Sequence, residues 1–212
     1  MIFFEILLEG TSDVPVVKEI LTRQFNLKED INFRIHPNKD KGNLPQNPSA
    51  MPDPKHRGLL DQLPAKLRGY SYLPDGYCVI VLVDADSTDC KELKKSLVDL
   101  YGQLDKRPSC ILFRIAVEEI ESWFLADINA VQSAYPKAKL SKISSIPPDR
   151  VVGAWEQIAE ALGVNPQDCD GGDKREWSIR ISPHLNFDQP KSPSLEAFIN
   201  GIARLVERHN SK

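Results

Sequence analysis

Several features that would place a protein in a familiar class are missing from this sequence. Its four cysteines, Cys78, Cys90, Cys110 and Cys169, include no pair with C-x-x-C spacing, which argues against a structural zinc site. Cys78 and Cys110 lie inside apolar runs, where a free cysteine behaves as a small hydrophobic residue. We therefore expect free thiols, no disulfide scaffold and a reducing compartment, with the cytoplasm as the default location.

The sequence also lacks a strong charge of either sign and a long apolar run. Its formal net charge of -3 over 212 residues excludes binding of nucleic acid through overall positive charge, although a local basic patch remains compatible. No run is long enough to cross a bilayer, and the apolar N-terminal run contains Glu5 and has no basic leader. We expect neither a signal peptide nor a membrane partner.

What the sequence does contain is an alternation of strand-like and helix-like segments. Strands are predicted at residues 2–8, 31–36, 77–83 and 109–117, and helices at residues 14–25, 58–69, 90–104 and 118–135. The run YCVIVLV at 77–83 has no polar alternation, which is typical of a parallel strand covered on both faces. We predict an α/β fold with a mostly parallel, Rossmann-like sheet flanked by helices.

Residues 140–212 depart from this pattern because they are rich in loops. Helices are predicted only near residues 150–162 and 194–208, with a polar stretch over 165–193. We expect residues 1–139 to form the α/β core and residues 140–212 to form a helical and loop-rich extension packed on the same domain.

Acidic residues follow two of the predicted strands directly. Glu9 ends the first strand, and Asp84 and Asp86 follow the most apolar one. Because ligands of open α/β sheets bind at the carboxyl ends of the strands, we expect these side chains to face one cavity. Residues two apart in an extended chain point the same way. Clustered carboxylates repel one another unless a cation is present, and oxygen-only ligands favour Mg²⁺ or Mn²⁺.

A further acidic pair follows the strand at 109–117. Glu118 and Glu121 are three residues apart on the predicted helix, so their side chains are neighbours. We expect them near the same edge of the sheet. The structural alternatives are a turn and helix cap for Asp84 and Asp86, and a solvated helix surface for the two glutamates.

Taken together, these stretches resemble the DUF4276 family of Toprim-like proteins, which is related to the Toprim domains of OLD-type nucleases. The segments that carry the resemblance are EGTSD (9–13), KDKGNL (39–44), LDQLPAKLRGY (60–70), VLVDADSTDC (81–90), RIAVEEIESWFLAD (114–127) and DKREW (173–177). The resemblance covers most of the chain. It implies a Toprim-like fold and a metal-dependent nuclease that hydrolyses phosphodiester bonds, within a phage-defence or mobile-element system.

The resemblance also implies roles for individual residues. Glu9 matches the Toprim glutamate, a metal ligand or acid/base, and Asp13 matches a second acid for which Glu is commoner. Lys174 is the candidate for a late lysine that stabilises negative charge, with Arg175 as the alternative. The implied catalytic set is Glu9, Asp84, Asp86 and Lys174, and the implied metal set is Glu9, Asp13, Asp84, Asp86, Glu118 and Glu121.

The loop at residues 36–58 is long for a simple connection and rich in polar residues, and such loops are often functional. Lys39, Lys41, Lys55 and Arg57 are the candidates for holding the backbone of DNA or RNA. Gly42 would allow a phosphate to approach the main chain closely. An ordinary solvated loop is the structural alternative.

Two other functions are compatible with the same residues. The stretch DADST at 84–88 fits the DxDxT motif of haloacid-dehalogenase-type phosphatases, with Asp84 as covalent nucleophile and Asp86 as acid/base. That motif normally follows the first strand of its domain, and Glu9 would then have no role. Alternatively, the chain is a non-catalytic Toprim module for a partner ATPase of ABC or AAA type, because it contains no GxxxxGK loop of its own.

Overall fold

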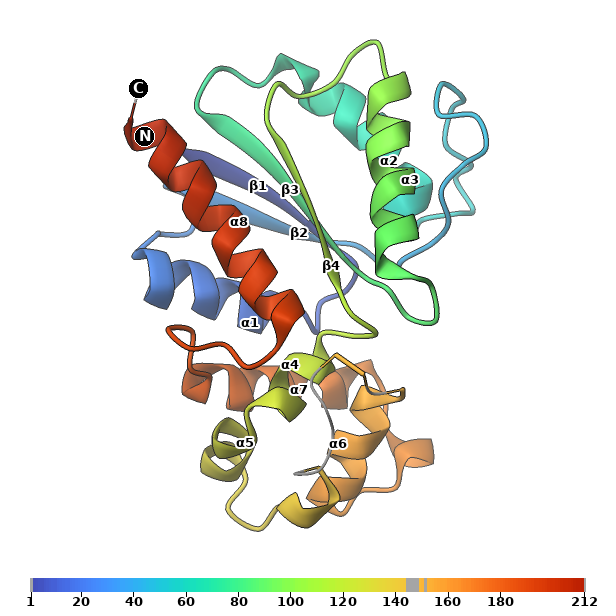
Figure 1. The fold of residues 1–212 in the computed structure, drawn as a ribbon. Helices are drawn as coiled ribbons and strands as arrows, with labels where there is room; N and C mark the ends of the chain where they lie inside the picture. The colour runs from blue at the N-terminus through green and yellow to red at the C-terminus, as the bar shows by residue number, and fades with distance from the viewer. Residues whose placement is uncertain (1, 144–148, 151, 212) are drawn as a thin grey trace.

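A four-stranded parallel sheet forms the centre of the computed structural model, which describes residues 2–143, 149–150 and 152–211. The strands are β1 (Phe3–Leu8), β2 (Phe33–Pro37), β3 (Tyr77–Asp84) and β4 (Ile111–Ala116), in the spatial order β2-β1-β3-β4 (Figure 1). All three strand pairs are parallel. The predicted α/β fold with a Rossmann-like parallel sheet is confirmed.

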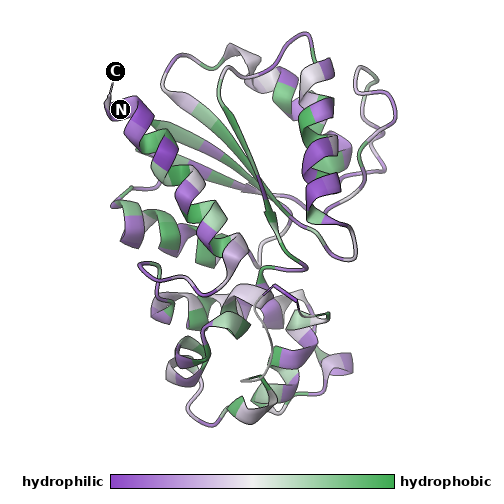
Figure 2. Ribbon diagram, in the orientation of Figure 1, coloured by the Kyte–Doolittle hydropathy of each residue, from purple (hydrophilic) through white to green (hydrophobic). Residues whose placement is uncertain are grey.

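Helices cover both faces of the sheet (Figure 1). One face carries α1 (Val14–Glu19), which continues as a π-helical segment over Ile20–Gln24, and α8 (Pro193–Asn210); the other carries α2 (Leu59–Gly69) and α3 (Cys90–Gln103). Alternate residues of β3 supply the two cores, Ile80 and Leu82 on the α1 face and Val79 and Val81 on the α2 face. This double burial explains why residues 78–83 of β3, which precede Asp84, are all apolar (Figure 2).

A smaller group of helices lies at the carboxyl ends of the strands (Figure 1). It contains α4 (Glu121–Ala126), α5 (Ile128–Ala134), α6 (Ala154–Leu162) and α7 (Gly171–Ile181). Trp123, Ile158 and Trp177 from these helices belong to the same apolar core as α1 and α8. The predicted boundary between residues 139 and 140 stays a prediction.

Two helical segments differ from the sequence expectation. α7 lies within the stretch 165–193, where few apolar residues signalled a helix; it begins with a capping box in which Asp170 and Asp173 each accept from the other's backbone N–H. The single helix predicted over 118–135 is instead two helices separated at Asp127, whose carboxylate accepts from the Asn186 N–H. One residue of the helix predicted at 150–162, at position 151, lies outside the described residues.

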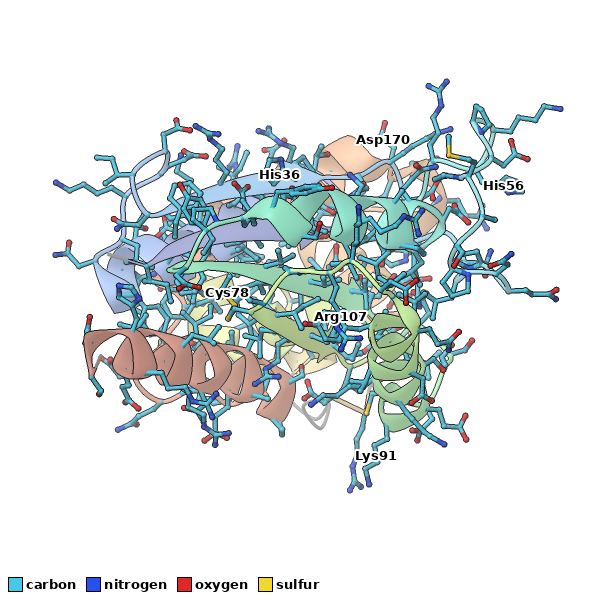
Figure 3. All side chains as sticks on the ribbon, turned by 90° about the horizontal axis from the view of Figure 1, so that it is seen from above. His36, His56, Cys78, Lys91, Arg107 and Asp170 are labelled. Carbon is cyan, nitrogen blue, oxygen red and sulfur yellow. A yellow bond between two sulfur atoms is a disulfide. The ribbon has the colours of Figure 1, made fainter. Side chains whose placement is uncertain are left out.

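The cysteines also differ from the expectation. A disulfide joins Cys78 in β3 to Cys110, which precedes β4. The two residues are cross-strand neighbours because Val79 pairs with Ile111 in the sheet. Cys78, labelled in Figure 3, is therefore not the free thiol that the sequence suggested, and the argument for a reducing compartment loses its support. Cys90 and Cys169 are free.

The membrane expectation concerns helix length and apolarity. Among the described residues, none of the helices combines the length and the apolar character needed to cross a bilayer.

Candidate functional site

Acidic side chains from several segments line one cavity of about 210 Å³ at the carboxyl edge of the sheet. The cavity is lined by Glu9, Gly10, Ser12, Asp13, Lys39, Asp40, Asp84, Asp86, Glu119, Glu121 and Lys174; we call it the acid cavity. Its position follows from the sheet register, because Leu8, the last residue of β1, pairs with Leu82, two residues before the end of β3. The Asp84 N–H accordingly donates to Glu9 Oε2 at 3.3 Å.

Asp13 is held in place by the turn that follows β1. Its Oδ2 accepts from the Gly10 N–H and its Oδ1 from the Ser12 hydroxyl, each at 3.0 Å. The side chain is buried, directly before α1. The EGTSD turn thus fixes Glu9 and Asp13 on the same cavity, which brings the first two acids of the predicted set together.

Asp86 lies on the rim of the acid cavity and contacts a lysine. Lys41 Nζ is 2.7 Å from Asp86 Oδ2 and also donates to the Ala85 carbonyl at 3.2 Å. The Lys41 side chain is only 16% exposed, whereas Asp86 is 51% exposed. Asp86 has a φ of 48°, so the chain is no longer extended there and the simple alternation argument does not apply. Both Asp84 and Asp86 nevertheless line the cavity.

Glu118 is the one predicted metal ligand that the structure places elsewhere. Its φ of 62° turns the chain before α4, which begins three residues later. Its carboxylate then accepts from the N–H groups of Gly153 and Ala154, at 2.6 and 3.2 Å, at the start of α6. The expectation that Glu118 completes the metal set is therefore corrected.

Glu119, which the sequence interpretation missed, lines the acid cavity together with Glu121. The missed signal is the Glu-x-Glu spacing of Glu119 and Glu121 shortly after β4, which repeats the Asp-x-Asp spacing that starts at the last residue of β3. Because the sequence predicts a helix from residue 118, helical spacing pairs Glu118 with Glu121 and leaves Glu119 out. Glu119 Oε2 is buried and has no hydrogen-bond partner among the described residues.

Lys174 provides the positive charge opposite these two glutamates. Its Nζ is 3.3 Å from Glu119 Oε1 and 4.0 Å from Glu121 Oε1, and it lies 4.9 Å from the centroid of the Trp155 ring. Arg175, the alternative for this role, is exposed and is not among the residues that line the cavity. The acid cavity is therefore lined by acids from the edge of the sheet and by a lysine from α7.

Burial raises the pKa of several of these carboxyl groups. The pKa of Glu9 is raised to about 7, first by burial and then by the charges of Asp13 and Asp86. Burial raises the pKa of Glu121 to about 8, even though the charge of Lys174 opposes the rise. The pKa of Asp84 lies well above its usual range, because of burial and the neighbouring charges of Asp13 and Glu9. Near neutral pH the acid cavity thus favours a bound proton or cation over full ionisation.

The donor chemistry of the acid cavity fits a hard divalent cation. Its lining offers carboxylate oxygens, which are the ligands of Mg²⁺ and Mn²⁺, and one of them, Glu119 Oε2, has no partner among the described residues. In the part of the chain described, no group of three His, Cys, Asp or Glu side chains is spaced to hold a metal ion as it stands.

The predicted nucleic-acid-binding residues divide into two groups. Lys41 contacts Asp86 on the rim of the acid cavity, as described above. Lys39 lines both the acid cavity and an adjacent cavity of about 570 Å³ that also contains Lys55 and Arg57. We call residues 39–57 the basic loop; His56, labelled in Figure 3, extends from its outer part.

The basic loop is anchored at its base by Asp61 of α2. The Asp61 carboxylate accepts from the N–H groups of Asn43 and Gly58, both at 3.0 Å. Gly42 has a φ of 65°, and a Cβ there would collide with the same carboxylate. The conformation that presents Lys41 to Asp86 is therefore built into the start of the loop.

A comparison with protein families gives one match. The family described as "Domain of unknown function (DUF4276)" matches residues 8–203. The chain belongs to the DUF4276 family. No curated protein and no solved structure matches it. The match spans all the acids of the cavity and Lys174, so the acid cavity lies wholly within the DUF4276 region.

Proposed function

We propose that this DUF4276 protein is a Mg²⁺- or Mn²⁺-dependent nuclease that hydrolyses phosphodiester bonds, with an active site of Toprim type. The observation that carries the proposal is the convergence of Glu9, Asp84 and Glu121 in one cavity with a lysine opposite them. Acids that lie far apart in the sequence have been brought to the position where open α/β sheets bind their ligands.

Different residues of the acid cavity would have different roles in hydrolysis. A divalent cation held by Glu9, Asp84 and Glu119 would supply an activated water and stabilise charge on the phosphate. Glu9 would hold that cation as a carboxylate, because a bound cation lowers its pKa from the value of about 7 that burial gives it. Lys174, 3.3 Å from Glu119, is placed to offset negative charge that develops on the phosphoryl oxygens.

The basic loop supports nucleic acid, DNA or RNA, as the substrate. Lys39 lies at the junction of the two cavities, and Lys55 and Arg57 continue from it. A phosphate backbone that enters the acid cavity would therefore meet positive charge on this side. The resemblance to OLD-type systems supports an ATPase partner in a defence or mobile-element system, since the sequence has no GxxxxGK loop.

The test is cleavage of labelled DNA and RNA in the presence of Mg²⁺ or Mn²⁺. We expect Asp84→Asn to lower cleavage by at least about a hundredfold, because it removes a metal ligand. The matched control is Asp99→Asn, the same change at an exposed position on α3, which should cut like the unaltered protein. Equal cleavage by Asp84→Asn and the unaltered protein would place the activity outside the acid cavity.

The phosphatase alternative makes a separate prediction. A haloacid-dehalogenase-type enzyme would form a phosphoaspartate analogue at Asp84 with beryllofluoride, whereas a metal-dependent nuclease should not. Asp84 shares its cavity with Glu9 and Asp13, which favours cation binding over a covalent role.

A further inference from the structure

Residues of β4, α3 and α8 line a groove of about 560 Å³. Figure 1 shows where these three elements lie. The floor includes Phe113 and Ile115, and the walls come from the first turns of α3 and from α8. We call it the edge groove. Its charged lining consists of Lys91, Lys94, Arg114 and Arg204 with the acids Asp149 and Glu196.

The four cations of this lining outnumber its two acids. Both carboxylate oxygens of Asp149 are engaged at the start of α8, where they accept from the Ser192 hydroxyl at 2.7 Å and the Ser194 N–H at 2.6 Å. Glu196 lies in the first turn of α8. No ion pair within the described ranges involves any of the four basic side chains. The edge groove therefore has an excess of two positive charges among its lining side chains, four cations against two acids.

Arg114 shows that this charge is built into the fold. Its Nε donates to the Ala197 carbonyl and its Nη1 to the Phe113 carbonyl, each at 2.8 Å. Its Nη2 lies over Gly201 of α8, where a Cβ would collide with the guanidinium, and has no hydrogen-bond partner in the described part of the chain. A glycine inside a helix costs about 1 kcal/mol relative to alanine. In α8 this less favourable residue stands at the position where a side chain would collide with Arg114.

Arg204 increases the need for an anion. Burial lowers the pKa of the Arg114 guanidinium, and the nearby charge of Arg204 lowers it further. An anion in the groove that both of these lining arginines contact would offset this repulsion. Lys91 and Lys94 line the opposite wall of the groove, so the ligand would meet positive charge on both sides.

We propose that the edge groove binds the phosphodiester backbone of a nucleic acid, at a second contact separate from the basic loop. The identity of the anion rests on the proposed function. The strand order places β4 beyond β3, whereas the basic loop follows β2 on the other side of β1. The acid cavity, at the ends of β1 and β3, lies between the two contacts. In Figure 3 Lys91 and His56 accordingly extend from different parts of the molecule.

The test compares two double charge reversals in a protein that cannot cut. Both are made in Asp84→Asn, and binding of labelled single- and double-stranded oligonucleotides is measured by fluorescence anisotropy in EDTA at several salt concentrations. The groove variant is Lys94→Glu with Arg204→Glu. The matched control, Lys95→Glu with Arg208→Glu, changes the same charge on the same two helices at exposed positions outside the groove.

We expect the groove variant to bind at least about tenfold more weakly than the control, since it loses two phosphate contacts. Its plot of log affinity against log salt should be shallower by about 1.4 for single strands and about 1.8 for duplexes. Equal binding by the two variants, or no binding by Asp84→Asn itself, would overturn the proposal. A groove that serves an acidic protein would also give equal binding here.

The outcome is separable from that of the proposed function. Weaker binding by the groove variant, together with no cleavage by the unaltered protein, would support the groove and reject the nuclease. Cleavage by the unaltered protein, together with equal binding by the two variants, would support the nuclease and reject the groove. Thermal melts of both variants ensure that only folded proteins are compared.

Discussion

At the scale of single residues, the acid cavity sets buried carboxyl groups against few counter-charges. The pKa values of about 7 for Glu9 and about 8 for Glu121 both lie above the ordinary value of 4.5. The folded protein therefore binds more protons than the unfolded chain between about pH 4.5 and pH 8. Stability contributed by these groups is full below pH 4.5 and is lost as the pH rises through this range.

The first prediction concerns the melting temperature, which should follow this loss of stability as the pH rises. With EDTA present, we expect the melting temperature to fall between pH 5 and pH 8, because protons that stabilise the folded state are lost. Glu121→Gln should raise stability at pH 8 by about 2 kcal/mol, which corresponds to about 4–8 °C for a chain of this size. It should have little effect at pH 5. Differential scanning fluorimetry measures both, and a melting temperature that rises with pH would contradict the assignment.

A second prediction separates the two neighbouring glutamates at the end of β4. Glu119→Gln should lower cleavage by about tenfold or more because it changes a cavity oxygen. Glu118→Gln should keep cleavage near the unaltered level while it weakens the cap on α6, at a cost of about 1 kcal/mol. Paired cleavage assays and urea unfolding curves measure these effects. Greater loss of cleavage in Glu118→Gln would restore the original assignment from the sequence.

At the scale of elements, α8 is shaped by the side chain that it covers. Gly201→Ala should lose about 1 kcal/mol of stability because the guanidinium of Arg114 must give up at least one of its two hydrogen bonds. In an Arg114→Ala background, the same change should become stabilising by up to about 1 kcal/mol. Gly102→Ala in α3, where a Cβ would meet nothing within 4 Å, is the control and should not destabilise.

The same scale shows which elements are predictable from sequence. All four strands are predicted within about two residues of their observed ends. The signal is clearest for β1 and β3, whose apolar residues are buried on both faces of the sheet. α7 was missed because its buried residues are few, Trp177, Ser178 and Ile181. The break before α4 was missed because a left-handed glutamate at 118 has no local sequence signal. Convergence of Glu9 with Asp84 could be anticipated because both acids lie at the carboxyl ends of predicted parallel strands. The contact between Lys41 and Asp86 depends on long-range packing.

At the scale of the whole molecule, the Cys78–Cys110 disulfide closes a loop with a sequence separation of 32 residues. Free cysteines were expected because spacing along the chain does not reveal cross-strand pairing. Replacing both with alanine should lower the free energy of unfolding by about 3–4 kcal/mol, through the larger entropy of the unfolded chain. Replacing Cys90 and Cys169, which are free, should change it little.

The measurement for this last prediction is denaturant unfolding of protein prepared without reductant. Mass spectrometry after alkylation should then count two blocked and two reactive cysteines. Four reactive cysteines in such a preparation would contradict the disulfide.

The position of Lys174 on α7 also affects how this protein can be divided or recombined. A fragment that ends at residue 139 would keep the acids of the sheet edge but lose the ammonium group 3.3 Å from Glu119. Transplanting the sheet without the later helices would thus leave Glu119 and Glu121 without that neutralising partner. For genetic fusion or truncation, the acids of the sheet edge and α7 therefore have to be kept in one fragment.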